Sequence, residues 1–376
     1  MPLTALSPAE TARTVAKLRL TVGVEEEFLL LDPETWLNAP RADAARAALD
    51  PAMHERSEIE FRRSMMEMVT PVCGDLAELR RRLRENRIAA GAAAEAVGAR
   101  LVAVAATPVG EPDLEVVDKP RFHAIARHYG PIAYDPALCG FHVHVGVPDR
   151  ELAVQVCNAI RPWLPVVQAL TANSPFHAGR DSGHASWRTI ALERWPSCGP
   201  SPYLRSLDDY ERVVAELVAS GVMLDASMVL WWARPSLRWP TVEIRVGDVC
   251  PTAAETAVIA GLARALVSTA VAGIAAGFEV VQPPEHLLRA AHWNAAHAGV
   301  GGTLLDLRTH AARPAWELVE DLVALVGPAL DRHGDRSLVE DGLFKLRGYG
   351  TGAQRQREAG SLHQAMAALA DATVTE

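Results

Sequence analysis

Three consecutive glutamates, Glu25 to Glu27, stand inside a run that otherwise has the composition of a buried β-strand, Thr21 to Leu31. Side chains alternate between the faces of a strand, so Glu25 and Glu27 point to one side, about 7 Å apart, and Glu26 points to the other. Burying such carboxylates costs on the order of several kcal/mol each unless a cation or protons compensate them. A hard divalent cation, above all Mg²⁺, would compensate the pair. An edge strand with a solvated acidic face is the simpler alternative.

A second apolar run carries carboxylates in the same way. Glu67 stands among methionines and valines in a segment that Pro71 ends, which is typical of a strand. Glu60 lies seven residues before Glu67, so it reaches the same side only if a bend or a bulge intervenes. A repeated pattern of inward carboxylates is harder to explain as a solvated surface than a single one.

Two later strands complete the candidate set. In residues 240–248, Glu243 and Arg245 share one face and apolar residues occupy the other, although an internal ion pair on a surface strand would explain this pair alone. In residues 139–147, alternation presents His142 and His144 on one face. Two imidazoles at this spacing can serve one metal ion, and the same pattern also occurs in zinc hydrolases.

In their order along the chain, these motifs resemble the glutamate–cysteine ligase family, specifically the YbdK-type carboxylate–amine ligases. The resemblance runs from about residue 20 to about residue 360. Each motif is short, but five of them in the right order over nearly the whole chain make a specific signal. The matching segments are Gly23–Glu27, Glu60–Pro71, His142–Gly146, Val242–Arg245 and Gly352–Arg357.

The resemblance implies an α+β fold like that of glutamine synthetase, in which an antiparallel sheet forms a funnel with flanking helices. It implies one catalytic domain over residues 1–376, with Mg²⁺ and the nucleotide phosphates on the inner face of the sheet. Glu60 is a departure: the longer bacterial class of glutamate–cysteine ligases has a similar segment but with aspartate at this position. The metal ligands carried over from the family are Glu25, Glu27, Glu60, Glu67, His142 and Glu243.

The same resemblance assigns the remaining roles. Arg245 and Glu67 are implied to be catalytic, and Arg245, Arg188 and Arg355 are implied to bind the nucleotide. A carboxylate must be activated before an amine can displace its oxygen, and ATP does this by forming an acyl phosphate. Mg²⁺, or Mn²⁺ in its place, would neutralise charge on the transferring group, and an arginine would stabilise it in the transition state.

The expected reaction is therefore ATP-dependent formation of an amide bond of the γ-glutamyl type, with release of ADP and phosphate. The amine must attack as a free base in a site closed to water, because the acyl phosphate would otherwise hydrolyse. Glutamate and cysteine are the default substrates of the family, and another amino acid or amine is an open alternative.

Composition and charge are those of an ordinary globular protein. The 376 residues are 49% hydrophobic and 22% charged, and the formal net charge of -9 argues against a nucleic-acid surface. The arginines of Arg80–Arg84 are expected on the solvated face of a helix. Five scattered cysteines and a start, Met1 to Leu20, without the apolar core of a signal peptide favour a cytoplasmic protein with reduced thiols. The resemblance suggests a homodimer.

Helical patterns are expected over five stretches, and one long segment lacks regular patterning. That segment, residues 173–203, is rich in prolines, glycines and polar turn residues, and we expect it to be a lid over the substrate, with Arg188 contacting an anionic group. The apolar stretch Ala257 to Val281 is interrupted by charged and polar residues, which predicts a buried helix and not a membrane span. The five expected helices are 75–97, 149–171, 207–220, 253–276 and 315–330.

Two other functional classes compete with the ligase. A zinc-dependent hydrolase would use His142 and His144, but it leaves Glu25, Glu67 and Arg245 without a role, and no H-E-x-x-H spacing accompanies the pair. A non-catalytic binding module would keep the acidic funnel and lack the chemistry. Release of ADP that depends on both an acid and an amine would support only the ligase.

Overall fold

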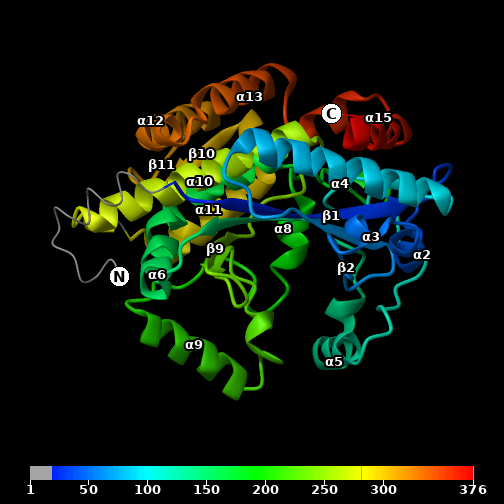
Figure 1. The fold of residues 1–376 in the computed structure, drawn as a ribbon, viewed down its shortest axis with the longest axis horizontal. Coiled ribbons are helices and arrows are strands. Elements are labelled where there is room, and N and C mark those ends of the chain that lie inside the picture. The colour runs from blue at the N-terminus through cyan, green and yellow to red at the C-terminus, as the bar shows by residue number, and fades with distance from the viewer. Residues whose placement is uncertain (1–18, 281, 376) are drawn as a thin grey trace.

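A computed structural model describes residues 19–280 and 282–375 of the chain. The expectation that the first twenty residues lack a signal peptide falls almost entirely outside this part. The described chain forms a mixed α+β fold built on a large antiparallel sheet with flanking helices (Figure 1), as the sequence predicts.

The sheet has the strand order β2-β3-β1-β5-β9-β8, and β4 pairs with the second half of β1. All of these pairings are antiparallel. The four strands expected from the sequence are all present, although β3 and β9 are shorter than the apolar runs that contain them. The bounds are β1 Val22–Leu31, β2 Ser57–Glu58, β3 Met65–Val69, β4 Arg100–Val102, β5 Phe141–Gly146, β8 Ala233–Pro235 and β9 Thr241–Ile244.

Long helices cover one face of the sheet (Figure 1). The five expected helices are all found, and the stretch 149–171 is divided near Pro162, which supplies no amide donor to continue the first helix. The helices that cover this face are α4 Leu76–Ala96, α10 Ala253–Ala275, α12 Ala315–His333, α13 Arg336–Tyr349 and α15 Leu362–Thr375.

Helix α10 is long and apolar enough to cross a membrane, but 72% of its most apolar window is buried inside the protein. It packs between the sheet and helices α4, α12 and α13, so it is a core helix, as expected from the sequence. Helix α4 begins at the Asp75 cap, which accepts a hydrogen bond from the Glu78 amide (2.8 Å). Its exposed arginines pair with Glu78 and Glu85, which confirms a solvated face.

Shorter elements complete the described chain. Helices α5 and α9 lie on the side of the sheet opposite to α4 and α12 (Figure 1). The remaining helices are α2 Ala42–Ala47, α3 Pro51–His54, α5 Pro120–Tyr129, α6 Arg150–Ile160, α7 Leu164–Thr171, α8 Trp187–Leu192, α9 Leu207–Ala219, α11 Glu285–Ala298 and α14 Gly352–Glu358; the 3₁₀ turns are η2 Gly130–Tyr134, η3 Arg161–Trp163, η4 Ala226–Met228 and η5 Gly299–Gly301; and two small hairpins pair β6 Phe176–His177 with β7 Arg180–Asp181 and β10 Thr303–Asp306 with β11 Ala311–Pro314.

The segment 173–203 is only partly irregular: it contains the short helix α8 and the β6–β7 hairpin, and residues 193–203 have no regular helix or strand. Its first part is fixed by the buried carboxylate of Asp248. That group accepts hydrogen bonds from the Asn173 amide (2.9 Å) and from the hydroxyls of Ser174 (2.7 Å) and Ser186 (2.8 Å). These bonds hold residues 173, 174 and 186 in place, and the expected lid role of the segment stays a prediction.

Glu26 is compensated within the helix-covered side of the sheet. Arg87 of α4 donates to both of its carboxylate oxygens, Nη2 to Oε1 at 2.5 Å and Nε to Oε2 at 3.1 Å. The Thr256 hydroxyl of α10 donates to Oε1 at 2.7 Å. Glu26 and Arg87 are each 1% exposed, so this ion pair joins the central strand to the two helices that cover it.

We expect Glu26→Gln to lower the free energy of unfolding by about 3–5 kcal/mol, because it leaves the buried guanidinium of Arg87 without its counter-ion. Chemical denaturation of the purified protein measures this difference. Glu85→Gln removes an exposed partner of Arg81 on the same helix and should cost less than about 1 kcal/mol. Equal effects of the two variants would show that backbone carbonyls alone satisfy Arg87.

Candidate active site

Side chains from four neighbouring strands form a row on the open face of the sheet, opposite to Glu26. The register produces it directly, because residues facing one another across an antiparallel pair point to the same side. The facing pairs are Glu67 of β3 with Glu27 of β1, Glu25 of β1 with His142 of β5, and His144 of β5 with Glu243 of β9. The structure therefore brings together five of the six residues expected as metal ligands, with His144 in addition.

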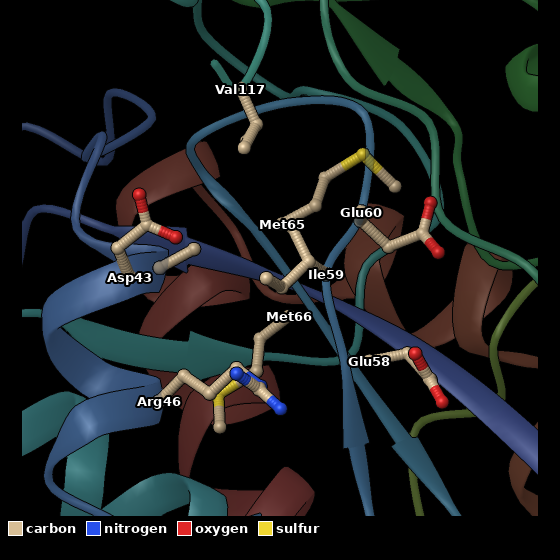
Figure 2. A pocket seen from close by; sticks show the side chains of 9 residues that line it. Asp43, Arg46, Glu58, Ile59, Glu60, Met65, Met66 and Val117 are labelled. Atoms are coloured by element: carbon tan, nitrogen blue, oxygen red, sulfur yellow. The ribbon is translucent and has the colours of Figure 1, made fainter. Parts of the chain in front are cut away.

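The sixth, Glu60, joins the row through the bend that its spacing requires. Strand β3 begins only at Met65, and residues 59–64 form the turn between β2 and β3. Figure 2 shows Glu60 and Glu58 on the same side of a pocket that Met65 and Val117 also line, with Asp43 on the other side. The negative charge of Glu60 acts on both Glu27 and Glu67.

Glu25 is the carboxylate that the two histidines share. His142 Nδ1 lies 2.9 Å from Glu25 Oε2, and His144 Nε2 lies 3.3 Å from Glu25 Oε1. The Thr241 hydroxyl lies 2.9 Å from His144 Nδ1. Burial opposes ionisation of Glu25, but the two imidazoles outweigh it and hold its pKa well below the usual value. Glu25 is therefore charged at neutral pH.

Glu27 and Glu67 have the opposite electrostatic character. Burial raises the pKa of Glu67 well above its usual 4.5, and the neighbouring charges of Glu60 and Glu25 add to the increase. Burial also raises the pKa of Glu27, against the attraction of His142. Glu27 Oε2 accepts a hydrogen bond from the Gly140 amide (2.6 Å), which fixes its orientation. These two carboxylates lack a sufficient counter-charge among the described residues.

The donor set fits divalent cations. Two groups of three residues each offer ligand atoms that lie within 4.8 Å of one another, and Glu25 belongs to both. One group adds Glu67 and His142, and the other adds His144 and Glu243. His144 Nε2 is buried and makes no well-aligned hydrogen bond to a described residue. Carboxylate oxygens with one imidazole suit Mg²⁺ or Mn²⁺, and a cation here would supply the charge that Glu27 and Glu67 need.

Two arginines stand at the far end of the row from Glu67. Arg245 Nη1 donates to Glu243 Oε1, as the shared face in the sequence predicts. Arg234 of β8 binds the same carboxylate from the other side, Nε to Oε2 at 3.0 Å. Burial opposes ionisation of Glu243, yet Arg245 and Arg234 together hold its pKa well below the usual value. Sequence reasoning missed Arg234, although a charge inside the apolar run Trp231–Pro235 was the available signal.

Arg188 lies close behind the row. Its guanidinium passes so near to Gly140 that any side chain at position 140 would collide with it. This explains why a glycine supplies the amide that binds Glu27. Arg188 is 4% exposed and pairs weakly with Asp248, Nη1 to Oδ1 at 3.9 Å. Its Nε is buried without a hydrogen-bond partner among the described residues. Its role toward an anionic ligand stays a prediction.

Arg355 does not join the row. It stands on α14, and its Nη2 donates to both carboxylate oxygens of Glu255, at 2.8 and 3.0 Å. Glu255 precedes Thr256, the residue of α10 that binds Glu26 on the helix-covered face. The structure therefore does not bring Arg355 together with the row, and its expected role in nucleotide binding stays a prediction.

We expect Glu67→Gln to raise the melting temperature of the metal-free protein and to abolish its stabilisation by Mg²⁺ or Mn²⁺. A buried carboxyl with a raised pKa opposes folding once the unfolded chain ionises, so the gain in stability should be absent below pH 4 and grow as the pH rises above the usual 4.5.

Thermal denaturation at several pH values, with and without Mn²⁺, measures both effects. Glu78→Gln, in the exposed arginine cluster of α4, is the control and should keep the response to the metal. A metal-free Glu67→Gln protein that is less stable than wild type at pH 7 would contradict this account of the site.

The sequence profile of glutamate–cysteine ligase family 2 matches residues 21–370. A Salinispora arenicola protein, provisionally named glutamate–cysteine ligase 2, is 62% identical over 338 residues, which cover 90% of this chain and 89% of that protein. A Nocardia farcinica protein, provisionally named glutamate–cysteine ligase 2-1, is 45% identical over 93% of this chain and 92% of its own length.

Solved structures share the fold at low sequence identity. A bifunctional glutathione synthetase from Pasteurella multocida superposes with a TM-score of 0.70 at 15% identity; the match covers 97% of this chain and 53% of that one, so this chain spans about half of its length. The glutamate–cysteine ligase of Francisella tularensis, solved in complex with AMP, superposes with a TM-score of 0.66 at 11% identity, covering 96% of this chain and 90% of that one.

Proposed function

The chain belongs to glutamate–cysteine ligase family 2, and from that premise we propose that it is an ATP-dependent ligase which joins a carboxylate to an amine through an acyl phosphate. The observation that carries the proposal is the row itself: carboxylates and imidazoles that suit divalent cations, ending at Glu243 and at Arg245, whose guanidinium suits phosphate. Cations and a nucleotide triphosphate chain need such a pairing of opposite charges.

The residues that would hold the cations are those of the two ligand groups. Glu25, Glu67 and His142 would hold one, close to Glu27 and Glu60, and Glu25, His144 and Glu243 would hold another. When bound, Mg²⁺ would neutralise charge on the phosphate oxygens as the phosphoryl group transfers. The shared Glu25 is suited to this because it is ionised at neutral pH.

Arg245 is the residue that we assign to the transferring phosphoryl group. It is more exposed than Arg234, with 18% of its side chain accessible against 10%, and its partner among the carboxylates is Glu243. A planar guanidinium with free N–H groups can bind two phosphate oxygens at once. Because negative charge shifts on these oxygens during transfer, the contact should be strongest in the transition state.

The walls on the open side of the sheet would keep water from the acyl phosphate. Helix α5 reaches the chain around η4, where Arg121 pairs with Asp225 and the Tyr129 hydroxyl donates to the Val222 carbonyl (3.2 Å). The η4 carbonyl of Ser227 accepts from Arg234, which connects this part of the chain to the Glu243 end of the row. An amine entering as a free base could then compete with water for the intermediate.

The substrate pair is inferred from the family. Glutamate and cysteine are the default, and another amino acid or amine remains the alternative. Arg188 is the candidate for binding a carboxylate of the acid substrate, because it is poorly paired and lies beside the peptide that holds Glu27. The zinc hydrolase alternative has less support, since both histidines contact the same Glu25 and therefore belong to the carboxylate cluster.

Trapping with hydroxylamine tests the intermediate. With glutamate, ATP and Mg²⁺ but no amine, addition of hydroxylamine should give the hydroxamate of the acid together with an equal amount of ADP. Mass spectrometry and nucleotide chromatography measure both products, and other acids take the place of glutamate if it is not accepted. AMP and pyrophosphate in place of ADP would contradict an acyl phosphate even if an amide were made.

Arg245→Lys tests the assignment of the phosphoryl contact. Lysine keeps the charge but lacks the planar fork, so we expect kcat to fall by about 100-fold while KM for ATP changes by less than about threefold. Steady-state kinetics measure both constants. Arg313→Lys, in the β10–β11 hairpin, is the control and should leave both unchanged. An effect on KM alone would make Arg245 a ground-state contact to the nucleotide.

A further inference from the structure

The two arginines beside Glu243 have different surroundings. Arg234 donates to Glu243 from Nε (3.0 Å) and from Nη2 (3.4 Å), and its Nη1 donates to the carbonyls of Val229 (2.6 Å) and Ser227 (3.3 Å). All three nitrogens of this guanidinium therefore have partners, and the residue is 8% exposed. Arg234 is fixed in position by groups that do not depend on any ligand.

Arg245 is held much less firmly. Its Nη1 contacts Glu243, and the same nitrogen lies 3.3 Å from His142 Nδ1. If that ring nitrogen carries the proton shared with Glu25 Oε2, it has no lone pair to accept from Arg245. Glu243 is then the single firm partner of Arg245 among the described residues, and the rest of this guanidinium is free to bind a ligand.

These surroundings assign different tasks to the two side chains. We propose that Arg234 is a positioning residue: it holds the Glu243 carboxylate in the orientation for metal binding and keeps it compensated when Arg245 turns to a phosphoryl group. The second half of this statement rests on the proposed function, whereas the positioning of Glu243 does not.

The electrostatic reason is the cost of an unpaired buried carboxylate. Glu243 is 3% exposed, so if Arg245 were its only counter-ion, any ligand that drew Arg245 away would leave a buried charge without compensation. A second, fixed guanidinium removes most of that cost. It also occupies Oε2 of Glu243 from the side of β8, which restricts the carboxylate to one orientation toward His144 and Glu25.

Binding of Mn²⁺ tests the positioning without any turnover. The electron paramagnetic resonance signal of free Mn²⁺ gives the number of bound ions and their affinities for the full chain. We expect two ions for wild type and, for Arg234→Gln, at least tenfold weaker binding of one of them. Arg234→Lys, which keeps the charge, should recover part of this affinity.

Arg264→Gln is the matched control. Arg264 is also buried and binds Asp335 through two hydrogen bonds, at 2.7 and 2.6 Å, away from the row. The Arg264→Gln protein should have a lower melting temperature than wild type and should still bind both Mn²⁺ ions when binding is measured well below that temperature. Unchanged Mn²⁺ binding in Arg234→Gln overturns the positioning role, and so does tighter binding, which is what loss of a nearby positive charge alone would give.

A double-variant cycle tests the release of Arg245. If Arg234→Gln leaves Arg245 tied to Glu243, both changes disable the same contact, so Arg234→Gln with Arg245→Lys should reduce kcat by no more than about threefold beyond the worse single variant. If the fold losses in kcat of the two single variants multiply in the double variant, this part of the inference is overturned. A wild-type protein that binds two Mn²⁺ ions but forms no amide or hydroxamate overturns the proposed function alone, because the Mn²⁺ comparison decides the positioning separately.

Discussion

A central strand that carries three consecutive carboxylates, one toward the helices and two toward the open face of the sheet, constrains the rest of this molecule. The alternation along β1 sends Glu26 to the helix-covered face, where Arg87 and Thr256 compensate it from α4 and α10. Glu25 and Glu27 face the other way, where the neighbouring strands present His142, His144 and Glu67 to them. The arrangement of the helical layer and that of the candidate active site therefore depend on the same three positions.

The row is electrostatically polarised along its length. At the β9 end, Arg234 and Arg245 compensate Glu243 fully, and in the middle the imidazoles keep Glu25 ionised. At the β3 end, Glu67 and Glu27 stand beside Glu60 without enough positive charge, and burial raises their pKa values. Uncompensated negative charge therefore gathers at the β3 end and the two arginines stand at the β9 end, with Glu25, which both ligand groups share, between them.

Two connections of the described chain are held by different kinds of interaction. The connection after α7 is anchored by the buried hydrogen bonds to Asp248, which are costly to break. The contact between α5 and the chain around η4 includes the Arg121–Asp225 pair, whose side chains are 43% and 39% exposed. Exposed ion pairs contribute at most about 1 kcal/mol each, so this contact depends mainly on the hydrophobic cluster in which Ile125 of α5 packs with Met223 and Met228.

The sequence by itself determined the carboxylate strands, the shared face of His142 and His144, and five helical stretches, one of which is divided near Pro162, because each depends on a local period of 2.0 or 3.6 residues. Its motifs also predicted the family. Only the tertiary structure decided which strands are neighbours, and hence that Glu67 faces Glu27 and that Glu25 is shared by two ligand groups. Long-range partners carry no local signal. The pairing of β8 with β9 brings Arg234 to Glu243, Arg355 pairs with Glu255, and Asp248 anchors Asn173 and Ser174.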